Sequence, residues 1–190
     1  MRHYLRTRSI SYHIYVIEQD HKDELNRGAL KNIGFIEART DRAYGCYVFH
    51  DVDLLPADDT DISYRCDPEV PLHISSSVDT LRYELPYLDI FGGVVALTEA
   101  MMEKTGGYPN RYFGWGGEDD DLGARVRKFY GPRIKHLPLA VGKYNMQEHP
   151  SERIPEDLSV QKKVDNWEEY HKQDTFRNLR YQIIQKEVSS

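Results

Sequence analysis

Apolar residues along the chain follow two spacings, and these predict strands that are followed by helices. Residues 12–18 are rich in β-branched and aromatic side chains, which is typical of a strand. Four apolar residues then recur at helical spacing on roughly one face: Leu25, Ala29, Ile33 and Ile36. A short apolar run at 46–49 predicts a buried strand, which ends abruptly in acidic residues.

The second half of the chain continues this alternation. Strands are predicted at 73–78 and 94–98, with Thr98 as the cap of a short helix that glycines 106 and 107 stop. A loop of glycines and aromatic residues at 112–117 precedes a helix with three apolar residues on one side: Leu122, Val126 and Phe129. The remaining predicted elements are a strand at 136–146 interrupted by Pro138, a charged helix at 160–173 and a last strand at 179–184. This order predicts one α/β sandwich domain.

Composition narrows the classes of function. The chain has 190 residues, a net charge of −6 at pH 7 and 39% apolar residues, so it suits one globular domain and is a poor match to nucleic acid or anionic membranes. No stretch of about 18 apolar residues occurs, so none of this chain is expected to span a bilayer. Its two cysteines, Cys46 and Cys66, fit either two buried thiols or one disulfide.

Two carboxylates stand where a predicted strand ends. Asp51 and Asp53 flank Val52 directly after the apolar run at 46–49. At a strand end the backbone turns, so both carboxylates can converge, and paired hard oxygens suit Mn²⁺ or Mg²⁺ beside a diphosphate. A plain solvated acidic turn is the alternative reading of this tripeptide.

The glycine-aromatic loop carries a stronger pattern. Trp115 offers a flat face that can stack on a sugar ring, and four acids follow it: Glu118, Asp119, Asp120 and Asp121. Acids favour the N-terminus of a helix because of its dipole, which explains one or two of them better than four. A carboxylate there can accept a proton from a hydroxyl nucleophile.

Two further residues are candidate metal ligands. Met146 and His149 lie three positions apart, and His149 beside Asp53 would favour Mn²⁺ over Mg²⁺ because imidazole is a borderline-soft donor. A structural or exposed histidine is the alternative.

Taken together, four segments resemble the β-1,4-galactosyltransferase family, which is glycosyltransferase family 7. They are NRGALKNIGF at 26–35, FHDVDLLP at 49–56, FGGVVAL at 91–97 and GWGGEDDD at 114–121, in the family's order. The resemblance implies a GT-A fold, which is a Rossmann-like α/β sandwich with a central mixed sheet. It also implies a single catalytic domain, 1–190, that lacks the family's N-terminal nucleotide-binding strand, because residues 1–5 do not match that strand.

The resemblance also assigns roles by motif position. Asp119 matches the catalytic base, and Asp53, Met146 and His149 match ligands of Mn²⁺. The donor-site positions are Arg27, Asp51, Val52, Ile90, Gly93 and Glu118, and the acceptor-site positions are Tyr87, Trp115 and Asp120. Cys46 and Cys66 match the family's disulfide pair.

The implied reaction is an inverting transfer of a hexose from a UDP-sugar to the 4-hydroxyl of a terminal GlcNAc-type acceptor on a glycoprotein or glycolipid. By this resemblance, family members that use galactose carry Tyr at the position that matches Ile90. Members of the invertebrate β-1,4-N-acetylgalactosaminyltransferase type carry a smaller aliphatic residue there and use GalNAc. Isoleucine leaves room for the 2-acetamido group, so UDP-GalNAc is the expected donor and UDP-galactose the alternative. Ile90 as a mere core residue beside a glycine turn is the other reading.

The resemblance places the activity in the Golgi lumen, in a parent protein of type II membrane topology. The segment after His149 does not match the family's acceptor-binding residues. A catalytically impaired member that binds sugar is therefore the second functional reading.

Overall fold

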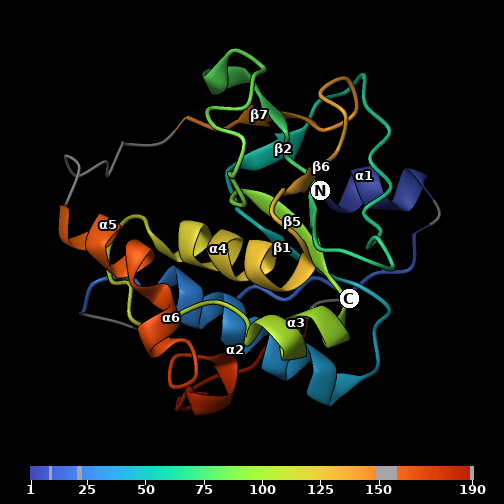
Figure 1. The fold of residues 1–190 in the computed structure, drawn as a ribbon. Helices are drawn as coiled ribbons and strands as arrows, with labels where there is room; N and C mark the ends of the chain where they lie inside the picture. The colour runs from blue at the N-terminus through green and yellow to red at the C-terminus, as the bar shows by residue number, and fades with distance from the viewer. Residues whose placement is uncertain (9, 21–22, 149–157, 189–190) are drawn as a thin grey trace.

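The computed structural model describes residues 1–8, 10–20, 23–148 and 158–188. Its strands form two small sheets (Figure 1). The first has the order β1-β5-β3-β6, and its strands are β1 (Tyr47–His50), β5 (Val94–Leu97), β3 (Leu72–His73) and β6 (Lys135–His136). The second has the order β2-β7-β4, and its strands are β2 (Leu54–Pro56), β7 (Lys143–Met146) and β4 (Ser77–Val78). Each sheet has parallel and antiparallel pairs, so the predicted mixed sheet is present but divided.

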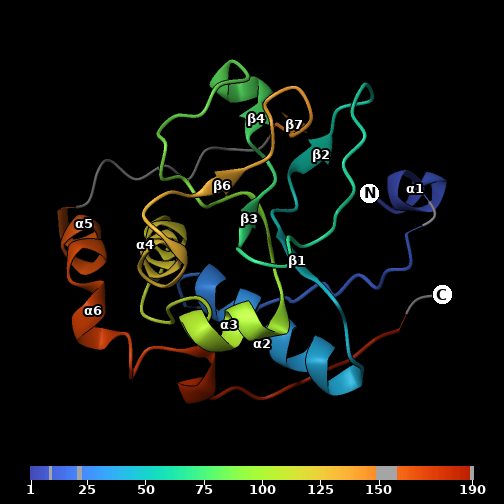
Figure 2. The same ribbon diagram turned by 45° about the vertical axis from the view of Figure 1, so that its right-hand side comes forward.

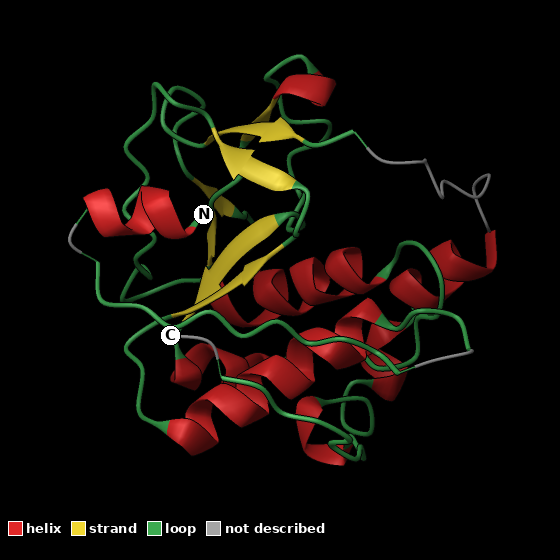
Figure 3. Ribbon diagram, turned by 180° about the vertical axis from the view of Figure 1, so that it is seen from behind, coloured by secondary structure: helices red, strands yellow, loops and turns green. Residues whose placement is uncertain are grey.

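Helices cover one side of the four-stranded sheet. The long ones are α2 (Arg27–Asp41) and α4 (Glu118–Tyr130), with the shorter α3 (Glu99–Thr105) beside them. Figure 3 shows the strands gathered to one side of this helical layer. The remaining helices are α1 (Arg2–Thr7), α5 (Leu158–Asp165) and α6 (Trp167–Tyr170), with 3-10 turns η1 (Asp79–Leu81) and η2 (Phe176–Asn178).

Strand β5 divides two hydrophobic clusters because its side chains alternate between the faces of the sheet. Val95 and Leu97 belong to the cluster that includes Phe35 of α2 and Leu122 of α4. Val94 and Ala96 belong to the cluster on the other face, which includes Leu5 of α1. Figure 2 shows α4 on one side of the strands and α1 on the opposite side. The α/β sandwich predicted from the sequence is therefore confirmed.

Helix ends follow their predicted signals. The Thr98 side chain accepts a hydrogen bond from the backbone N–H of Met101, and α3 ends at Gly106, which has φ +77°. Helix α2 begins after Asn26, whose side chain accepts from the N–H of Ala29. Leu25, which the sequence analysis placed in this helix, therefore lies before it, and its side chain is exposed.

Several predicted strands are wrong. Residues 12–18 and 179–184 run along the surface without strand pairing. In the first segment Tyr15 and Ile17 are half-buried, whereas residues 180–184 of the second are all exposed. The Tyr15 hydroxyl donates to Asp41 at 2.7 Å and also contacts Tyr44, which ties the first segment to the end of α2 by side chains. Residues 2–7, where the sequence analysis predicted no element, form helix α1.

Two predicted strands are each split between the sheets. Residues 73–78 contain the end of β3 and all of β4, and residues 136–146 contain the end of β6 and all of β7. The charged helix predicted at 160–173 is likewise two helices, α5 and α6. In all three cases the chain turns within a run whose composition alone indicates one element.

Candidate active site

The tripeptide of Asp51, Val52 and Asp53 is the turn that leads from β1 into β2, and therefore from one sheet to the other. The backbone N–H of Asp51 donates to the carbonyl of Gly93 at 3.0 Å, since β1 pairs with β5. The N–H of Leu54 donates to the carbonyl of Asp51 at 3.3 Å and closes the turn. Val52 is 91% exposed at its tip.

Asp53 lies beside Met146. Leu54 pairs with Met146 in the β2–β7 ladder, and the N–H of Gln147 donates to the carbonyl of Asp53 at 2.7 Å. Strand pairing thus brings two of the three predicted metal ligands together from positions 93 residues apart in the chain. His149, the third, lies outside the described residues. No cluster of three histidine, cysteine, aspartate or glutamate residues that could hold a metal occurs in the described part of the chain.

The acids at the start of α4 each contact a different side chain. Glu118 is buried and accepts a hydrogen bond from Nε of Arg27 at 2.8 Å. Asp120 accepts one from the hydroxyl of Tyr87 at 2.6 Å. This juxtaposition of predicted donor-site and acceptor-site residues explains four consecutive acids better than the helix dipole does.

Asp119 is the acid that meets the β1–β2 turn. Nζ of Lys31 lies 3.0 Å from Oδ1 of Asp119 and 3.4 Å from Oδ1 of Asp51, so one ammonium group bridges the two carboxylates. Burial raises the pKa of Asp119, Lys31 opposes that rise, and Asp51 adds to it. The net effect favours a carboxylate that takes up a proton more readily than an ordinary aspartate.

Glycine is required where the β5 end approaches α4. A Cβ at Gly92 would lie 2.7 Å from Oδ2 of Asp119, closer than side chains tolerate. Gly93 has φ +74°, and a Cβ there would lie 2.6 Å from Oγ of Ser75. Gly92 therefore lets the backbone of the FGG segment pass directly beside the candidate base, and Gly93 lets it turn next to Ser75.

Lys31 was not singled out by the sequence prediction. It lies one helical turn after Arg27, so the two cations share a face of α2 and meet two successive acids of α4. Burial opposes the charge of Lys31, but Asp119 raises its pKa above the usual range, and Tyr108 and Asp51 also contribute to the rise. A basic pair four residues apart, in a chain that also contains consecutive acids, is the signal that could have identified it.

The remaining predicted residues surround this centre. The N–H of Ile90 donates to the carbonyl of Tyr87 at 3.4 Å, and the Ile90 side chain is half-buried. Trp115 is 46% exposed in a loop whose glycines 114, 116 and 117 all have positive φ. Tyr87 and Asp120 lie 33 residues apart in the sequence, and only the fold brings them together.

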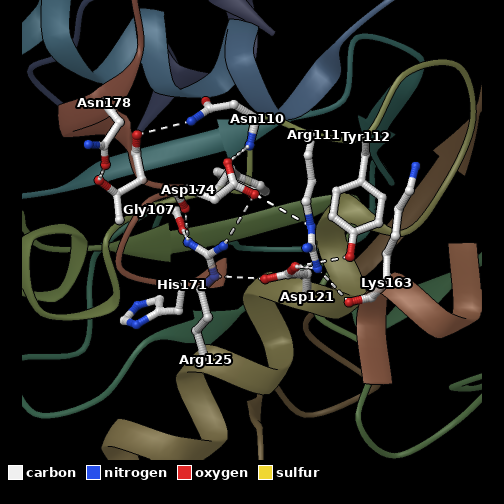
Figure 4. Close-up of polar contacts among 12 residues, drawn as sticks. Gly107, Asn110, Arg111, Tyr112, Asp121, Arg125, Lys163, His171, Asp174 and Asn178 are labelled. Atoms are coloured by element: carbon white, nitrogen blue, oxygen red, sulfur yellow. Dashed lines mark hydrogen bonds and ion pairs between the residues drawn. The ribbon is translucent and has the colours of Figure 1, made fainter. Parts of the chain in front are cut away.

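Asp121, the fourth acid, faces the interior (Figure 4). It accepts from Nε of Arg125 at 2.7 Å and from the hydroxyl of Tyr112 at 3.0 Å, and all three side chains are buried. Arg125 also donates to the carbonyls of Gly107 at 3.0 Å and Asp174 at 2.9 Å. This network joins the N-terminal end of α4 to the segment before η2.

Cys46 and Cys66 form a disulfide, with 5.3 Å between their Cα atoms. The expected pairing is confirmed. The bond closes a 20-residue separation in sequence, and that loop contains the β1–β2 turn with Asp51 and Asp53.

Comparisons with known proteins agree with this geometry. A model described as "N-terminal region of glycosyl transferase group 7" matches residues 1–67, and one described as "N-terminal domain of galactosyltransferase" matches residues 72–150. β-1,4-Galactosyltransferase 3 of Cricetulus griseus is 40% identical over 97% of this chain and 47% of its own length. Human β-1,4-galactosyltransferase 2 is 38% identical over 95% of this chain and 48% of its own.

Among solved structures, the catalytic domain of Drosophila β-1,4-galactosyltransferase 7 in complex with xylobiose has a TM-score of 0.80 and 22% identity. The match covers 97% of this chain and 77% of that one. A mutant of the same enzyme, in complex with manganese, UDP-Gal and xylobiose, has a TM-score of 0.75.

The fold is therefore that of the GT-A galactosyltransferase catalytic domains. The two family models together match well over half of the chain, and the chain belongs to glycosyltransferase family 7, the β-1,4-galactosyltransferase family. It spans about half the length of the curated relatives that it matches. Within the described residues, no helix combines the length and the apolar character that crossing a membrane requires.

Proposed function

We propose that residues 1–190 form a catalytic domain that transfers a hexose, with inversion, from a UDP-sugar to the 4-hydroxyl of a terminal GlcNAc-type acceptor. The observation that carries this proposal is the placement of Asp119 against Gly92 and, through Lys31, beside Asp51. Membership of family 7 supports the reaction class. GlcNAc-terminated glycoproteins or glycolipids are the proposed acceptors.

Asp119 is the proposed base. Its raised pKa, which burial causes, brings the carboxylate closer to the basicity that general base catalysis needs near neutral pH. The carboxylate takes the proton from the attacking 4-hydroxyl, and attack on the face opposite UDP inverts the anomeric carbon. Tyr87 holds Asp120 beside it, where both are available to orient the acceptor. Trp115, which is exposed on its glycine loop, is proposed to cover a sugar ring.

The proposed cofactor is Mn²⁺. The paired ends of β2 and β7 fit a metal in part, because they bring the backbones of Asp53 and Met146 together, and these residues carry a carboxylate and a thioether. His149 is the proposed third ligand. When bound, the metal supplies positive charge that offsets the charge of the departing diphosphate. The Mn²⁺ in the structure of the Drosophila relative supports this assignment.

The proposed donor is UDP-GalNAc, as in the invertebrate β-1,4-N-acetylgalactosaminyltransferase type. Half-buried Ile90 next to the FGG segment supports it, because an aliphatic side chain leaves room for an acetamido group. UDP-galactose is the second candidate, and the names of the relatives favour it. Arg27, Glu118, Asp51, Val52 and Gly93 are proposed to contact the donor.

The proposed location is the Golgi lumen, within a type II membrane protein. The disulfide between Cys46 and Cys66 supports an oxidising compartment.

A sugar-binding module without turnover is the second candidate function. The ion pair between Lys31 and Asp119 favours it, since an ammonium group at 3.0 Å occupies one oxygen of the base. This candidate predicts sugar binding and no release of UDP.

The deciding experiment uses the whole protein with Mn²⁺, each UDP-sugar and a GlcNAc acceptor. Replacing Asp119→Asn keeps the shape of the side chain and removes its basicity, so transfer should fall by roughly 100-fold or more while UDP binding persists. Asp58→Asn, at an exposed acid after β2, is the matched control and should keep full activity. Removing the metal with EDTA should abolish transfer.

Near wild-type transfer by Asp119→Asn would show that another group is the base. No transfer by the wild-type protein, with sugar binding retained, would favour the sugar-binding module.

A further inference from the structure

Two histidines meet at the edge of the four-stranded sheet. β3 and β6 run parallel with His73 opposite His136, and their Nδ1 atoms lie 2.8 Å apart. His73 is buried, and His136 is half-buried. Neither residue belongs to the metal site, the candidate base or the disulfide.

The outer nitrogens of this pair face two carbonyl groups of one segment. Nε2 of His73 lies 3.0 Å from the carbonyl oxygen of Gly92, and Nε2 of His136 lies 2.9 Å from that of Leu88. The two carbonyls bracket Ile90, and Gly92 is the residue whose Cα lies against Asp119. The pair therefore clamps both ends of the segment that is proposed to select the donor.

Counting protons shows what the clamp requires. A carbonyl oxygen only accepts hydrogen bonds, so both Nε2 atoms must carry a proton. The contact between the two Nδ1 atoms needs one proton more. Three hydrogen bonds thus need three protons on two imidazole rings, whereas two neutral rings carry only two. The complete clamp holds one positive charge.

A neutral pair leaves one of the three contacts without a proton, either between the two Nδ1 atoms or at one of the two carbonyl groups. The neutral arrangement with a bare Nε2 on His73 has one possible substitute donor. The hydroxyl of Ser75 lies 3.4 Å from Nε2 of His73 and could donate to it if that nitrogen carried no proton. The bare nitrogen would then face the carbonyl oxygen of Gly92 at 3.0 Å, with two acceptors in contact. The same hydroxyl also lies 3.3 Å from that carbonyl, which offers it another acceptor.

The charge belongs on the less buried ring of the pair, which is His136, because burial disfavours charge. Burial, and then the charge of His136, lowers the pKa of His73 to about 3, so His73 stays neutral. Charged residues on the neighbouring elements are already paired: Asp89 with Arg127, Lys135 with Asp67, and Asp119 with Lys31. Strand β5 carries no charged residue. The extra proton of the pair therefore needs no carboxylate among the described residues. The three protons are accepted by the carbonyl oxygens of Gly92 and Leu88 and by one Nδ1 atom of the pair.

We propose that His73 and His136 are positioning residues, which hold residues 88–92 in place only while the pair carries three protons. The inference rests on the proposed function for its catalytic consequence alone. As the pH rises and the pair loses its extra proton, one of the three hydrogen bonds is lost and two hydrogen-bond acceptors face each other, so the segment with Ile90 loosens. Donor binding should weaken in the same pH range.

The first test counts the protons on the two histidine rings and does not depend on catalytic activity. Nitrogen-15 NMR of the histidine-labelled whole protein, with His136→Ala for assignment, distinguishes protonated from bare ring nitrogens. At pH 6 we expect three protonated nitrogens in the pair, and two at high pH. Two neutral rings at pH 6 would overturn the proposal, whatever the activity of the protein.

The second test separates positioning from mere stability. His136→Ala should raise the donor KM and lower kcat/KM at pH 6 by about 10- to 100-fold, because small misplacements are costly in an active site. His136→Arg, which donates at every pH, should restore most of the activity and remove the pH dependence of the donor KM. His13→Ala, at an exposed histidine, is the control and should behave as wild type.

A loss of thermal stability in His136→Ala with an unchanged donor KM and pH profile would reduce the pair to a structural role. If no variant and no wild-type protein transfers sugar, the proposed function fails, while the proton count still decides the charge of the pair.

Discussion

At the scale of single residues, the four consecutive acids that begin α4 each contact a different side chain. Glu118 pairs with Arg27, Asp119 with Lys31, Asp120 with Tyr87, and Asp121 with Arg125. Successive helix positions point about 100° apart, so each acid faces a different element. Only Asp119 faces the β1–β2 turn, and this sets it apart from its neighbours as the proposed base.

Lys31 should tune that base. Lys31→Met removes the main cation that opposes burial and Asp51 and leaves the weaker contribution of Arg27, so the pKa of Asp119 should rise further. A base works only when deprotonated, so activity present above its pKa is lost as the pH falls through it. The acid limb of the kcat/KM profile should move to higher pH, and a shift of one pH unit means about tenfold less activity on that limb.

Lys31→Arg keeps the charge and is the control for this prediction. An acid limb that is the same in Lys31→Met and in wild type would show that Lys31 does not influence the base.

Ile90 should control the choice of donor. Ile90→Tyr introduces a ring and a hydroxyl where GalNAc carries its acetamido group, so preference should shift towards UDP-galactose. A steric effect of this size is worth roughly 1–3 kcal/mol, or about 10- to 200-fold in specificity. The measurement is kcat/KM for both donors with a GlcNAc acceptor, and Ile90→Val is the control. A wild-type preference for UDP-galactose would defeat the donor assignment.

The site was predictable from sequence where a motif lies within one segment. The strand end at Asp51 and Asp53 and the helix start at Glu118 both follow from local pattern. Lys31 and the histidine pair were not predictable, because their partners come from distant segments: Lys31 meets Asp119 88 residues away, and His73 meets His136 63 residues away. Only the fold creates these contacts.

At the scale of elements, the errors in the predicted strands share one cause. A strand is defined by its partner, and composition reports only the tendency to be extended. Residues 12–18 have that tendency without pairing, and residues 73–78 serve two different sheets. Helices were easier to predict, because their hydrogen bonds are local and caps such as Asn26 and Thr98 mark their ends.

The disulfide should stabilise the loop that carries the turn between the sheets. Closing a loop of about 20 residues contributes roughly 3 kcal/mol in the chain-entropy model. The double variant Cys46→Ser with Cys66→Ser should therefore unfold at lower denaturant concentration than wild type, by about that free energy. Wild-type protein treated with a reductant should match the variant. Two free thiols in the secreted wild-type protein, found by mass analysis without reduction, would refute the pairing.

At the scale of the whole molecule, a buried ionic network ties the C-terminal third to the active site. Arg125 is 1% exposed, pairs with Asp121 and donates to the carbonyl of Asp174. Arg111 lies 3.6 Å from the Asp174 carboxylate and 3.8 Å from that of Asp121 (Figure 4). The packing of the residues around 174 therefore depends on the first turn of α4, and the packing of that turn depends on those residues.

Breaking this network should destabilise the fold strongly. Arg125→Met leaves the buried Asp121 without its closest cation, which should lower the free energy of unfolding by about 3–5 kcal/mol. Arg127→Met, two positions along the same helix and partly exposed, should cost only about 0–1 kcal/mol. Denaturant titrations of the two variants would test this. Equal stabilities would mean that Arg125 contributes no more than a surface ion pair.

The turn between the two sheets also limits how the chain can change in length. Asp51 is hydrogen-bonded to Gly93 of the first sheet and Asp53 to Gln147 after β7 of the second, with Val52 alone between them. Two residue steps reach at most about 7 Å, so each carboxylate stays near the other however the sheets vary. Insertions should be tolerated in many surface loops of this molecule. An insertion between Asp51 and Asp53 should abolish activity. Evolution should therefore preserve the spacing of the tripeptide as well as its two acids.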